Sequence, residues 1–286
     1  MVATIVSFAV IGGLTMQPLS SMAQQLEQDQ EQGQQGDQQR QSTTQLGDTT
    51  TAVTNAACGQ VVEGLVELNS DLNCSGDGLI VGADGTTIRL NGHTIRGPGP
   101  DSSKVGISVG NEDGVRIEGT GTIEGFQAGI LASGAKGTSI TSMTLRGNQI
   151  AVFSTGTEDL QAMQNIITKN SIGLASHSSN GLDLTENLIS GNQLAGITLN
   201  TTDNSLISKN NVEQNDNGVY IDAYSNGNRI EYNDFLENEV DLNNANGLAI
   251  NVNSNSFSDN NCKTSNPSGL CTITAINALQ LQQSPG

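Results

Sequence analysis

Five side chains that could do chemistry recur at nearly constant spacing in this chain. His177, Asn200 and Asp222 follow one another at almost equal intervals, and Phe153 and Tyr220 fall on a parallel series two positions earlier. A histidine can act as general base, an aspartate can orient it or act as acid, and an asparagine can bind a hydroxyl or carboxylate. Tyr and Phe rings can stack on a sugar ring. The types therefore suggest His177 and Asp222 as catalytic residues and Phe153, Asn200 and Tyr220 as substrate-binding residues. A polar solvated face is the alternative, because Asn and Asp are abundant.

These residues belong to a sequence repeat that sets their relative positions. Short apolar segments recur with a period of about 22 residues, beginning at Gly106, Gly129, Ala151, Gly173, Gly196, Gly218 and Asp241. Each repeat holds two further short segments, separated by Gly, Asn, Ser and Asp, which tolerate tight turns. A period of this length indicates a solenoid, in which each repeat packs on the next.

The composition of the repeats favours strands over helices. Gly and Asn are too frequent for helices, and the apolar residues alternate instead of recurring at three-and-four spacing. A leucine-rich repeat has a similar length, but its LxxLxL frame is absent. The sequence therefore predicts an all-β fold, a single right-handed parallel β-helix (solenoid) with three short strands per coil of about 22–23 residues. Equivalent strands then stack about 4.8 Å apart.

Asparagines five positions apart recur once in each repeat. In a β-helix, residues one period apart lie over each other, so these side chains form columns whose amides hydrogen-bond from coil to coil. One predicted column is Asn165, Asn187, Asn210, Asn233 and Asn255, and the other is Asn148, Asn170, Asn192, Asn215, Asn238 and Asn260. We interpret both columns as structural ladders.

Alternation within the strands predicts which side chains face outward. At 218–221, Val219 and Ile221 point inward and Tyr220 points outward. Carried along the stack, this predicts one outer column of Ser108, Leu131, Phe153, Ala175, Thr198, Tyr220 and Asn243, and a neighbouring column of Gly110, Ser133, Thr155, His177, Asn200, Asp222 and Ala245. The candidate residues thus gather on the exposed face of the first sheet.

The remaining polar residues are assigned to turns or to the surface. His93, in the segment NGHT, is expected to cap a turn in an early coil. Calcium is the one alternative to a chain without cofactors, and Asp183, Glu186, Glu231 and Asp234 could bind it on another face. Because the glycine-rich nonapeptide of strong calcium sites is absent, these four are treated as surface residues, and no metal ligand is predicted.

Charge limits the partners of this chain. Its formal charge is −18, from 29 acidic and 11 basic residues among 286. Nucleic acid is disfavoured as a partner, because binding it relies on Lys and Arg. Direct binding of a polyanionic glycan is also disfavoured, unless a divalent cation bridges the two.

The segment 1–57 differs from the repeats. Residues 2–14 are apolar but short for a membrane span, and Ser21-Met22-Ala23 offers a cleavage site, so residues 1–23 are expected to be a secretory signal peptide. An uncleaved anchor is the alternative, since no Lys or Arg precedes the apolar run. Residues 24–57, rich in Gln and Thr, are predicted to be a disordered linker. Residues 58–275 are assigned to the β-helix and 276–286 to a tail, with no membrane span in the mature chain.

Four cysteines lie at the two ends of the predicted β-helix. Four cysteines allow three pairings. We predict the local pairs Cys58–Cys74 and Cys262–Cys271, because each falls where an end of the stack needs a cap. Export favours disulfides over free thiols. A zinc site is disfavoured, because the spacings are not those of a zinc knuckle and no His lies near either pair.

The opening segment DLNCSGDGLIVGADGTTIRLNGHTIRG, at 71–97, adds a family resemblance. With the repeats that follow, it resembles secreted parallel β-helix repeat proteins of the pectin-lyase-like superfamily. The resemblance covers about residues 58–262 and implies the fold. That superfamily includes pectate and pectin lyases, polygalacturonases, alginate epimerases, a periplasmic copper-processing protein and phage tailspikes, so the fold alone does not give a function.

The catalytic motifs of this superfamily are incomplete here. A polygalacturonase-like site would need NTD, DD, GHG and RIK motifs, whereas the chain has NGHT at 91–94, RIE at 116–118 and 229–231, and no DD. The epimerase DPH motif is absent. Two His and five Met are few for a copper role.

Two functions remain from the sequence. The favoured one is a secreted or cell-surface, non-catalytic module that binds a carbohydrate or another cell-envelope component. The alternative is a polysaccharide-modifying enzyme, a lyase, epimerase or glycoside hydrolase, that acts along the exposed face of the first sheet.

Overall fold

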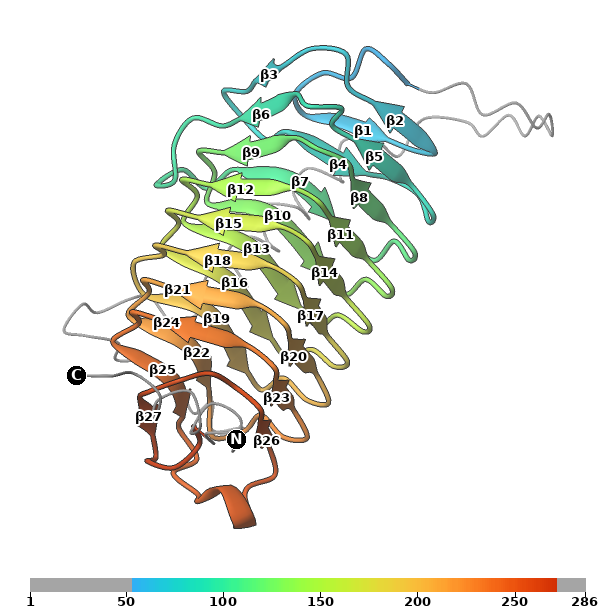
Figure 1. Ribbon diagram of the computed structural model, residues 1–286. Coiled ribbons are helices and arrows are strands. Elements are labelled where there is room, and N and C mark those ends of the chain that lie inside the picture. Colours follow the sequence, from blue (N-terminus) through green and yellow to red (C-terminus); the bar gives the residue numbers. More distant parts are fainter. Residues whose placement is uncertain (1–52, 272–286) are drawn as a thin grey trace, which may run out of the picture. The chain divides into compact units, whose positions relative to one another are not determined.

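The computed structural model describes residues 53–271, and these form a parallel β-helix. Figure 1 shows three sheets of short strands stacked coil upon coil. Consecutive strands along each sheet are parallel and belong to successive coils, as in the pairing of β10 with β13. The prediction of an all-β solenoid with three short strands per coil is therefore confirmed.

Each sheet collects one strand from every coil. The first sheet contains β1 (Gln60–Val62), β4 (Leu79–Val81), β7 (Val105–Val109), β10 (Ala128–Ser133), β13 (Ile150–Thr155), β16 (Ile172–His177), β19 (Ala195–Asn200), β22 (Asn217–Ile221), β25 (Val240–Asn244) and β27 (Ser265–Asn266). The second contains β2 (Leu65–Glu67), β5 (Thr87–Arg89), β8 (Arg116–Glu118), β11 (Ser139–Thr141), β14 (Gln161–Met163), β17 (Asp183–Thr185), β20 (Leu206–Ser208), β23 (Arg229–Glu231) and β26 (Ser256–Ser258). The third contains β3 (Leu72–Asn73), β6 (Thr94–Arg96), β9 (Thr122–Glu124), β12 (Thr144–Arg146), β15 (Ile166–Thr168), β18 (Leu188–Ser190), β21 (Asn211–Glu213) and β24 (Asp234–Leu236).

The core is a set of apolar columns, because the central residue of each three-residue strand points inward. In the second sheet this column is Val66, Ile88, Ile117, Ile140, Ala162, Leu184, Ile207, Ile230 and Phe257, and in the third it is Leu72, Ile95, Ile123, Leu145, Ile167, Ile189, Val212 and Phe235. Burying one large apolar side chain contributes about 1.5–3 kcal/mol. Many such side chains, stacked in register, hold the coils together.

Two coils are longer than the regular repeat. Leu79 pairs with Ile107 and Arg229 pairs with Ser256, so in both places the partner comes later in the chain than the regular period would put it. The first insertion is the Gly- and Pro-rich loop after β6, and the second carries the 3-10 turn η1 (Ile250–Val252). Both loops leave the strand pairing on either side intact.

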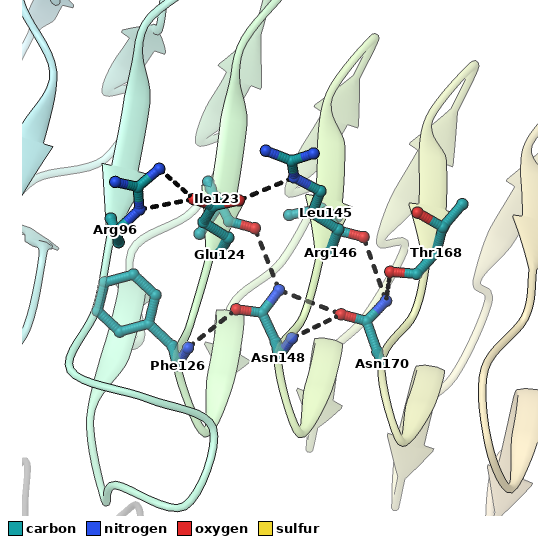
Figure 2. Close-up of polar contacts among 9 residues, drawn as sticks. All are labelled: Arg96, Ile123, Glu124, Phe126, Leu145, Arg146, Asn148, Thr168 and Asn170. Carbon is teal, nitrogen blue, oxygen red and sulfur yellow. Dashed lines mark hydrogen bonds and ion pairs between the residues drawn. The ribbon is translucent and has the colours of Figure 1, made fainter.

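The asparagine ladders are confirmed over most of their length. In Figure 2, Nδ2 of Asn148 donates to the Ile123 carbonyl at 3.1 Å and to Oδ1 of Asn170 at 3.2 Å, and the backbone N of Asn148 donates to the same Oδ1 at 2.9 Å. The same three bonds recur along Asn170, Asn192 and Asn215 and along Asn165, Asn187 and Asn210. Buried corner groups are thereby satisfied without water.

Both predicted columns are wrong at the last coil. Asn233 donates to Oδ1 of Asn260, not of Asn255, and Asn238 bonds to Asp241 instead of continuing to Asn260. The prediction assumed a regular period at the last coil, but the insertion with η1 lengthens that coil and moves the stacked asparagine further along the chain. Asn255 lies at another corner, where its Oδ1 accepts hydrogen bonds from the backbone N and Nδ2 of Asn228.

The predicted disulfides close both ends of the described stack. Cys58 is bonded to Cys74, and Cys262 to Cys271. Ordered pairing begins earlier than predicted, because Val53 forms a parallel bridge with Val66 and packs against the core. Val53, assigned to the linker from its composition, therefore pairs with the β-helix instead. The signal peptide at 1–23, the rest of the linker and the tail at 276–286 lie outside the described residues. Within 53–271 there is no helix long and apolar enough to cross a membrane.

Candidate functional site

The two predicted outer columns of the first sheet are in register. Phe153, Ala175, Thr198 and Tyr220 pair in sequence across β13, β16, β19 and β22, and Thr155, His177 and Asn200 pair in the same way. Asp222 follows the end of β22, and its Oδ1 accepts a hydrogen bond from the backbone N of Thr201 at 3.1 Å. The strand pairing therefore brings His177, Asn200, Tyr220 and Asp222 together on successive coils.

Phe153 does not join them as an accessible ring. Its side chain has no exposed surface, and neither have those of Leu131 and Ala175 beside it in the column. The expectation that Phe153 offers a ring for stacking on a sugar is therefore wrong for this structure. Alternation predicted the side of the sheet but could not predict the exposure of that side.

Asp222 is bound by its own turn. Its Oδ1 accepts hydrogen bonds from the backbone N of Tyr224 and Ser225 at 3.1 and 2.9 Å and from Oγ of Ser225 at 2.6 Å, in addition to the bond from Thr201. Four donors on one oxygen hold the carboxylate in place. This arrangement gives Asp222 a part in building the 222–225 turn, as aspartates do in Asx turns.

Three buried polar atoms on neighbouring coils lack a hydrogen-bond partner among the described residues. They are Nδ1 of His177, Oγ1 of Thr198 and Oδ2 of Asp222. Thr198 is adjacent to Tyr220 in the strand register, and His177 is adjacent to Asn200. Buried polar groups are satisfied in the great majority of cases. Unpaired atoms also occur at Gln127, Thr138, Asn211 and Asn244, so these three atoms alone do not define a site.

The phenol of Tyr220 sits at the edge of this group. Burial, and then the negative charge of Asp222, raise the pKa of Tyr220 above its ordinary value. The hydroxyl therefore stays protonated at neutral pH and can donate a hydrogen bond. Together with the half-buried Asn200 and His177, it forms a polar surface with one aromatic ring.

The other polar residues named from the sequence lie elsewhere. Nδ1 of His93 lies 3.3 Å from Oδ1 of Asp71, and its backbone N closes a turn onto the Leu90 carbonyl. Glu186 accepts a hydrogen bond from Gln164 and Glu231 from Arg229. Among the described residues, no three His, Cys, Asp or Glu side chains converge as metal ligands would, so calcium gains no support.

The ligands that copper prefers also stay apart in residues 53–271. Copper binds imidazole nitrogen and the sulfur of Cys and Met. All four cysteines are in disulfides, and His93 and His177 lie several coils apart. Met143 is buried in the core, and the partly exposed Met163 ends β14, a second-sheet strand that contains neither histidine. The described side chains therefore do not fit a copper site.

Sequence reasoning missed a charged cluster on the third sheet. Glu124 lies between Arg96 and Arg146 in the strand register and forms an ion pair with each, as Figure 2 shows. With Lys169 and the loop residues Gly97, Pro98 and Gly99 they line an open surface cavity of about 330 Å³. The sequence signal was the alternation of Arg, Glu and Arg from coil to coil, but the insertion after β6 lengthens the interval between Arg96 and Glu124 and hides it.

Several solved structures are similar to this chain. A mutant of the DFA-IIIase of Arthrobacter chlorophenolicus in complex with DFA-III is 17% identical, with a TM-score of 0.48, over 68% of this chain and 52% of its own. The chain thus spans about half the length of that enzyme. The tailspike protein 2 enzymatically active domain of bacteriophage CBA120 is 13% identical, with a TM-score of 0.39, over 75% of this chain and 42% of its own. The A-module of the mannuronan C-5 epimerase of Azotobacter vinelandii is 14% identical, with a TM-score of 0.29, over 68% and 67% of the two chains.

The sequence itself identifies the family. No curated protein matches the chain significantly. The family model described as "Periplasmic copper-binding protein (NosD)" matches residues 70–269, which is more than half of the chain and nearly all of the described β-helix. The protein with these stacked coils, asparagine ladders and disulfide-closed ends belongs to the NosD family.

Proposed function

We propose that this chain is an extracytoplasmic, non-catalytic β-helix protein that binds a carbohydrate of the cell envelope on the first sheet. The observation that carries this proposal is the row of partly exposed side chains His177, Asn200 and Tyr220 on successive coils, which combines hydrogen-bonding groups with one aromatic ring. A polyhydroxylated ligand offers hydroxyl groups that both donate and accept hydrogen bonds, so successive sugar units could pair with these partly exposed groups. Sites for small ligands combine a few such polar groups with an aromatic or apolar surface.

Tyr220 and Asn200 supply the rest of the binding surface. The ring of Tyr220 is partly exposed and could lie against a sugar, and its protonated hydroxyl could donate to it. Asn200 offers an amide on the coil before, about 4.8 Å away along the stack. A ladder with this spacing suits an extended chain of sugars better than a compact ligand.

A binding role is preferred over a catalytic one because of the contacts of Asp222. Its Oδ1 is held by four donors from the turn and from Thr201. No hydrogen bond joins Asp222 to His177 among the described residues, so the pair lacks the base–orienter contact of a catalytic site. We therefore expect no turnover of polysaccharide by the purified chain.

The family supports an extracytoplasmic location for this chain. Its description names the periplasm, and two disulfides suit an oxidising compartment. The description also names copper, but the described side chains do not fit a copper site, so copper has no part in this proposal.

The test is a binding screen of the full chain on an array of neutral cell-envelope oligosaccharides. Tyr220→Ala is expected to lower the affinity for the bound glycan by about tenfold or more, because an aromatic anchor and a hydrogen bond are lost together. Asn200→Ala is expected to lower it less.

The matched control is Tyr232→Ala. Tyr232 is exposed but follows a strand of the second sheet, away from the first-sheet surface. Binding unchanged by Tyr220→Ala, or reduced equally by Tyr232→Ala, would rule out the first-sheet site. Release of sugar products from a bound polysaccharide would show that the chain is an enzyme and would contradict the non-catalytic role.

A further inference from the structure

Two charged ladders of opposite sign lie on neighbouring faces of the β-helix. On the second sheet, Arg89 lies between Glu67 and Glu118, with ion-pair distances of 3.2 and 2.8 Å. On the third sheet the order is reversed, and Glu124 lies between Arg96 and Arg146, at 2.6 and 2.8 Å. The first ladder has a formal charge of −1 and the second of +1.

In the third-sheet ladder, some basic groups are not fully used by Glu124 and can bind another partner. Nε of Arg146 bonds to Oε2 of Glu124, and no other bond to its guanidinium occurs within the described residues. The ammonium of Lys169 has no ion pair there either. The side chain of Arg146 is 52% exposed, whereas that of Glu124 is only 16% exposed. The guanidinium of Arg146 is therefore more accessible to solvent than the carboxylate of Glu124 that orients it.

These cations line a shallow cavity that is open to solvent. The cavity of about 330 Å³ lies between the third-sheet strand ends and the loop from Gly97 to Gly99. The loop is anchored by bonds from the backbone N of Gly97 to the Glu124 carbonyl and of Gly99 to the Gly125 carbonyl, at 2.9 and 2.8 Å. The cavity volume lies at the lower end of the range for ligand pockets and exceeds what a bare inorganic oxyanion fills.

Local charge at this cavity opposes that of the whole chain. Arg96, Arg146 and Lys169 carry three positive charges against the one negative charge of Glu124, in a chain with a net charge of −18. At physiological ionic strength, charges more than about 8 Å away are largely screened, so the local excess of +2 dominates inside the cavity. Arginine binds oxyanions in a bidentate manner, and Lys adds a point charge.

We propose that this cavity binds an acidic saccharide unit, with the oxyanion of the sugar held by Arg146 and Lys169 and the sugar ring lying against the 97–99 loop. A carboxylate or a sulfate ester provides the shared chemistry. The site is separate from the first-sheet surface. It does not depend on the function proposed for that surface. A single acidic unit fits the local charge, whereas the acidic remainder of the chain would repel a long polyanion.

The test is calorimetric titration of the full chain with four probes. These are a galacturonic acid trisaccharide, the neutral galactose trisaccharide, a sulfated disaccharide and inorganic sulfate. We expect the uronate or the sulfated sugar to bind, the neutral sugar to bind at least about tenfold more weakly, and the affinity to fall as salt is raised. Whichever acidic sugar binds more tightly identifies the oxyanion.

Arg146→Gln with Lys169→Gln is expected to lower the affinity by about tenfold or more. The matched control is Arg116→Gln with Lys209→Gln, which removes the same charge from an exposed strand residue and a corner residue of the second sheet. Lys169→Gln alone tests the site without touching the ion pairs of Glu124. The Tyr220→Ala variant is expected to bind the acidic sugar normally.

Four results would each overturn the proposal. They are no binding of either acidic sugar, equal binding of the neutral trisaccharide, equal loss of affinity in the second-sheet control, and binding of inorganic sulfate as tight as that of the sugars. Loss of acidic-sugar binding in Tyr220→Ala would move the ligand to the first sheet.

Discussion

Oδ1 of Asn210 accepts two hydrogen bonds from Asn187 on the preceding coil, one from the backbone N and one from Nδ2, both at 2.9 Å. Nδ2 of Asn187 also donates to the Ala162 carbonyl, on the coil before its own, at 2.8 Å. Each asparagine thus binds the coils before and after its own. The corner is satisfied only when every member of the column is present.

Replacing one ladder residue should therefore destabilise the whole stack. Asn187→Ala leaves the buried backbone N of Asn165 without its acceptor and takes one of two acceptors from its Nδ2, which keeps the Ile140 carbonyl. The free energy of unfolding should fall by about 3 kcal/mol, because unpaired buried groups are costly. Chemical denaturation would measure this. Asn69→Ala, at an exposed asparagine with one side-chain bond to Asn55, should change it by less than about 0.5 kcal/mol. Equal effects would show that the ladder is unimportant.

Neighbouring residues in β24 allow a test of the core columns. Phe235 is buried in the third-sheet column, and Leu236 beside it points outward and is 36% exposed. Phe235→Ala should lower the free energy of unfolding by about 3–5 kcal/mol, since it opens a cavity between coils. Leu236→Ala should cost less than about 1 kcal/mol. Thermal melts of both variants would measure the difference, and similar losses would contradict the inward orientation of Phe235.

The two disulfides should contribute unequally to stability. Cys58–Cys74 closes a loop with a sequence separation of 16 and Cys262–Cys271 one of 9. Replacing the first pair by serines should cost about 3 kcal/mol and the second about 2.5 kcal/mol, from the entropy of loop closure in the unfolded chain. Denaturation of each double variant under non-reducing conditions would test this. A loss near zero for the first pair would mean that the N-terminal cap folds without it.

The ion pairs of Glu124 should make stability depend on acid pH. Burial raises the pKa of Glu124, but the hydrogen bonds and charges of Arg96 and Arg146 outweigh it and hold the pKa below the ordinary value of 4.5. Because the folded pKa is depressed, the stabilisation is complete above the unfolded pKa and is lost as the pH falls through the folded pKa.

Glu124→Gln should therefore be less stable than the parent chain at pH 7 and lose less stability between about pH 5 and pH 3. Unfolding midpoints across this range would measure both effects. Glu63→Gln is the control, because Glu63 is exposed and forms no ion pair among the described residues. Parallel pH profiles for the parent chain and Glu124→Gln would show that Arg96 and Arg146 do not lower the pKa of this carboxyl.

Much of this architecture could be predicted from the residues alone. A β-helix places each residue over the one a single period further on, so the repeat leads directly to strand stacking, the asparagine columns and the register of His177 with Asn200. The local cysteine spacing predicted both disulfides. These features follow from sequence because the contacts of a solenoid are set by one short period.

Other features depended on the tertiary structure. Insertions changed the local period, so Asn260 and not Asn255 accepts from Asn233, and Arg96 comes opposite Glu124. The exposure of a side chain could not be predicted either, because alternation gives the side of a strand but not what packs against that side. Phe153 is buried for this reason. The charge of the third-sheet cavity arises because Arg96, Arg146 and Lys169, from three different coils, meet beside one partly buried glutamate. The period of the sequence thus determined the stack, whereas loop lengths and burial, which are decided in three dimensions, determined which side chains meet and which are exposed.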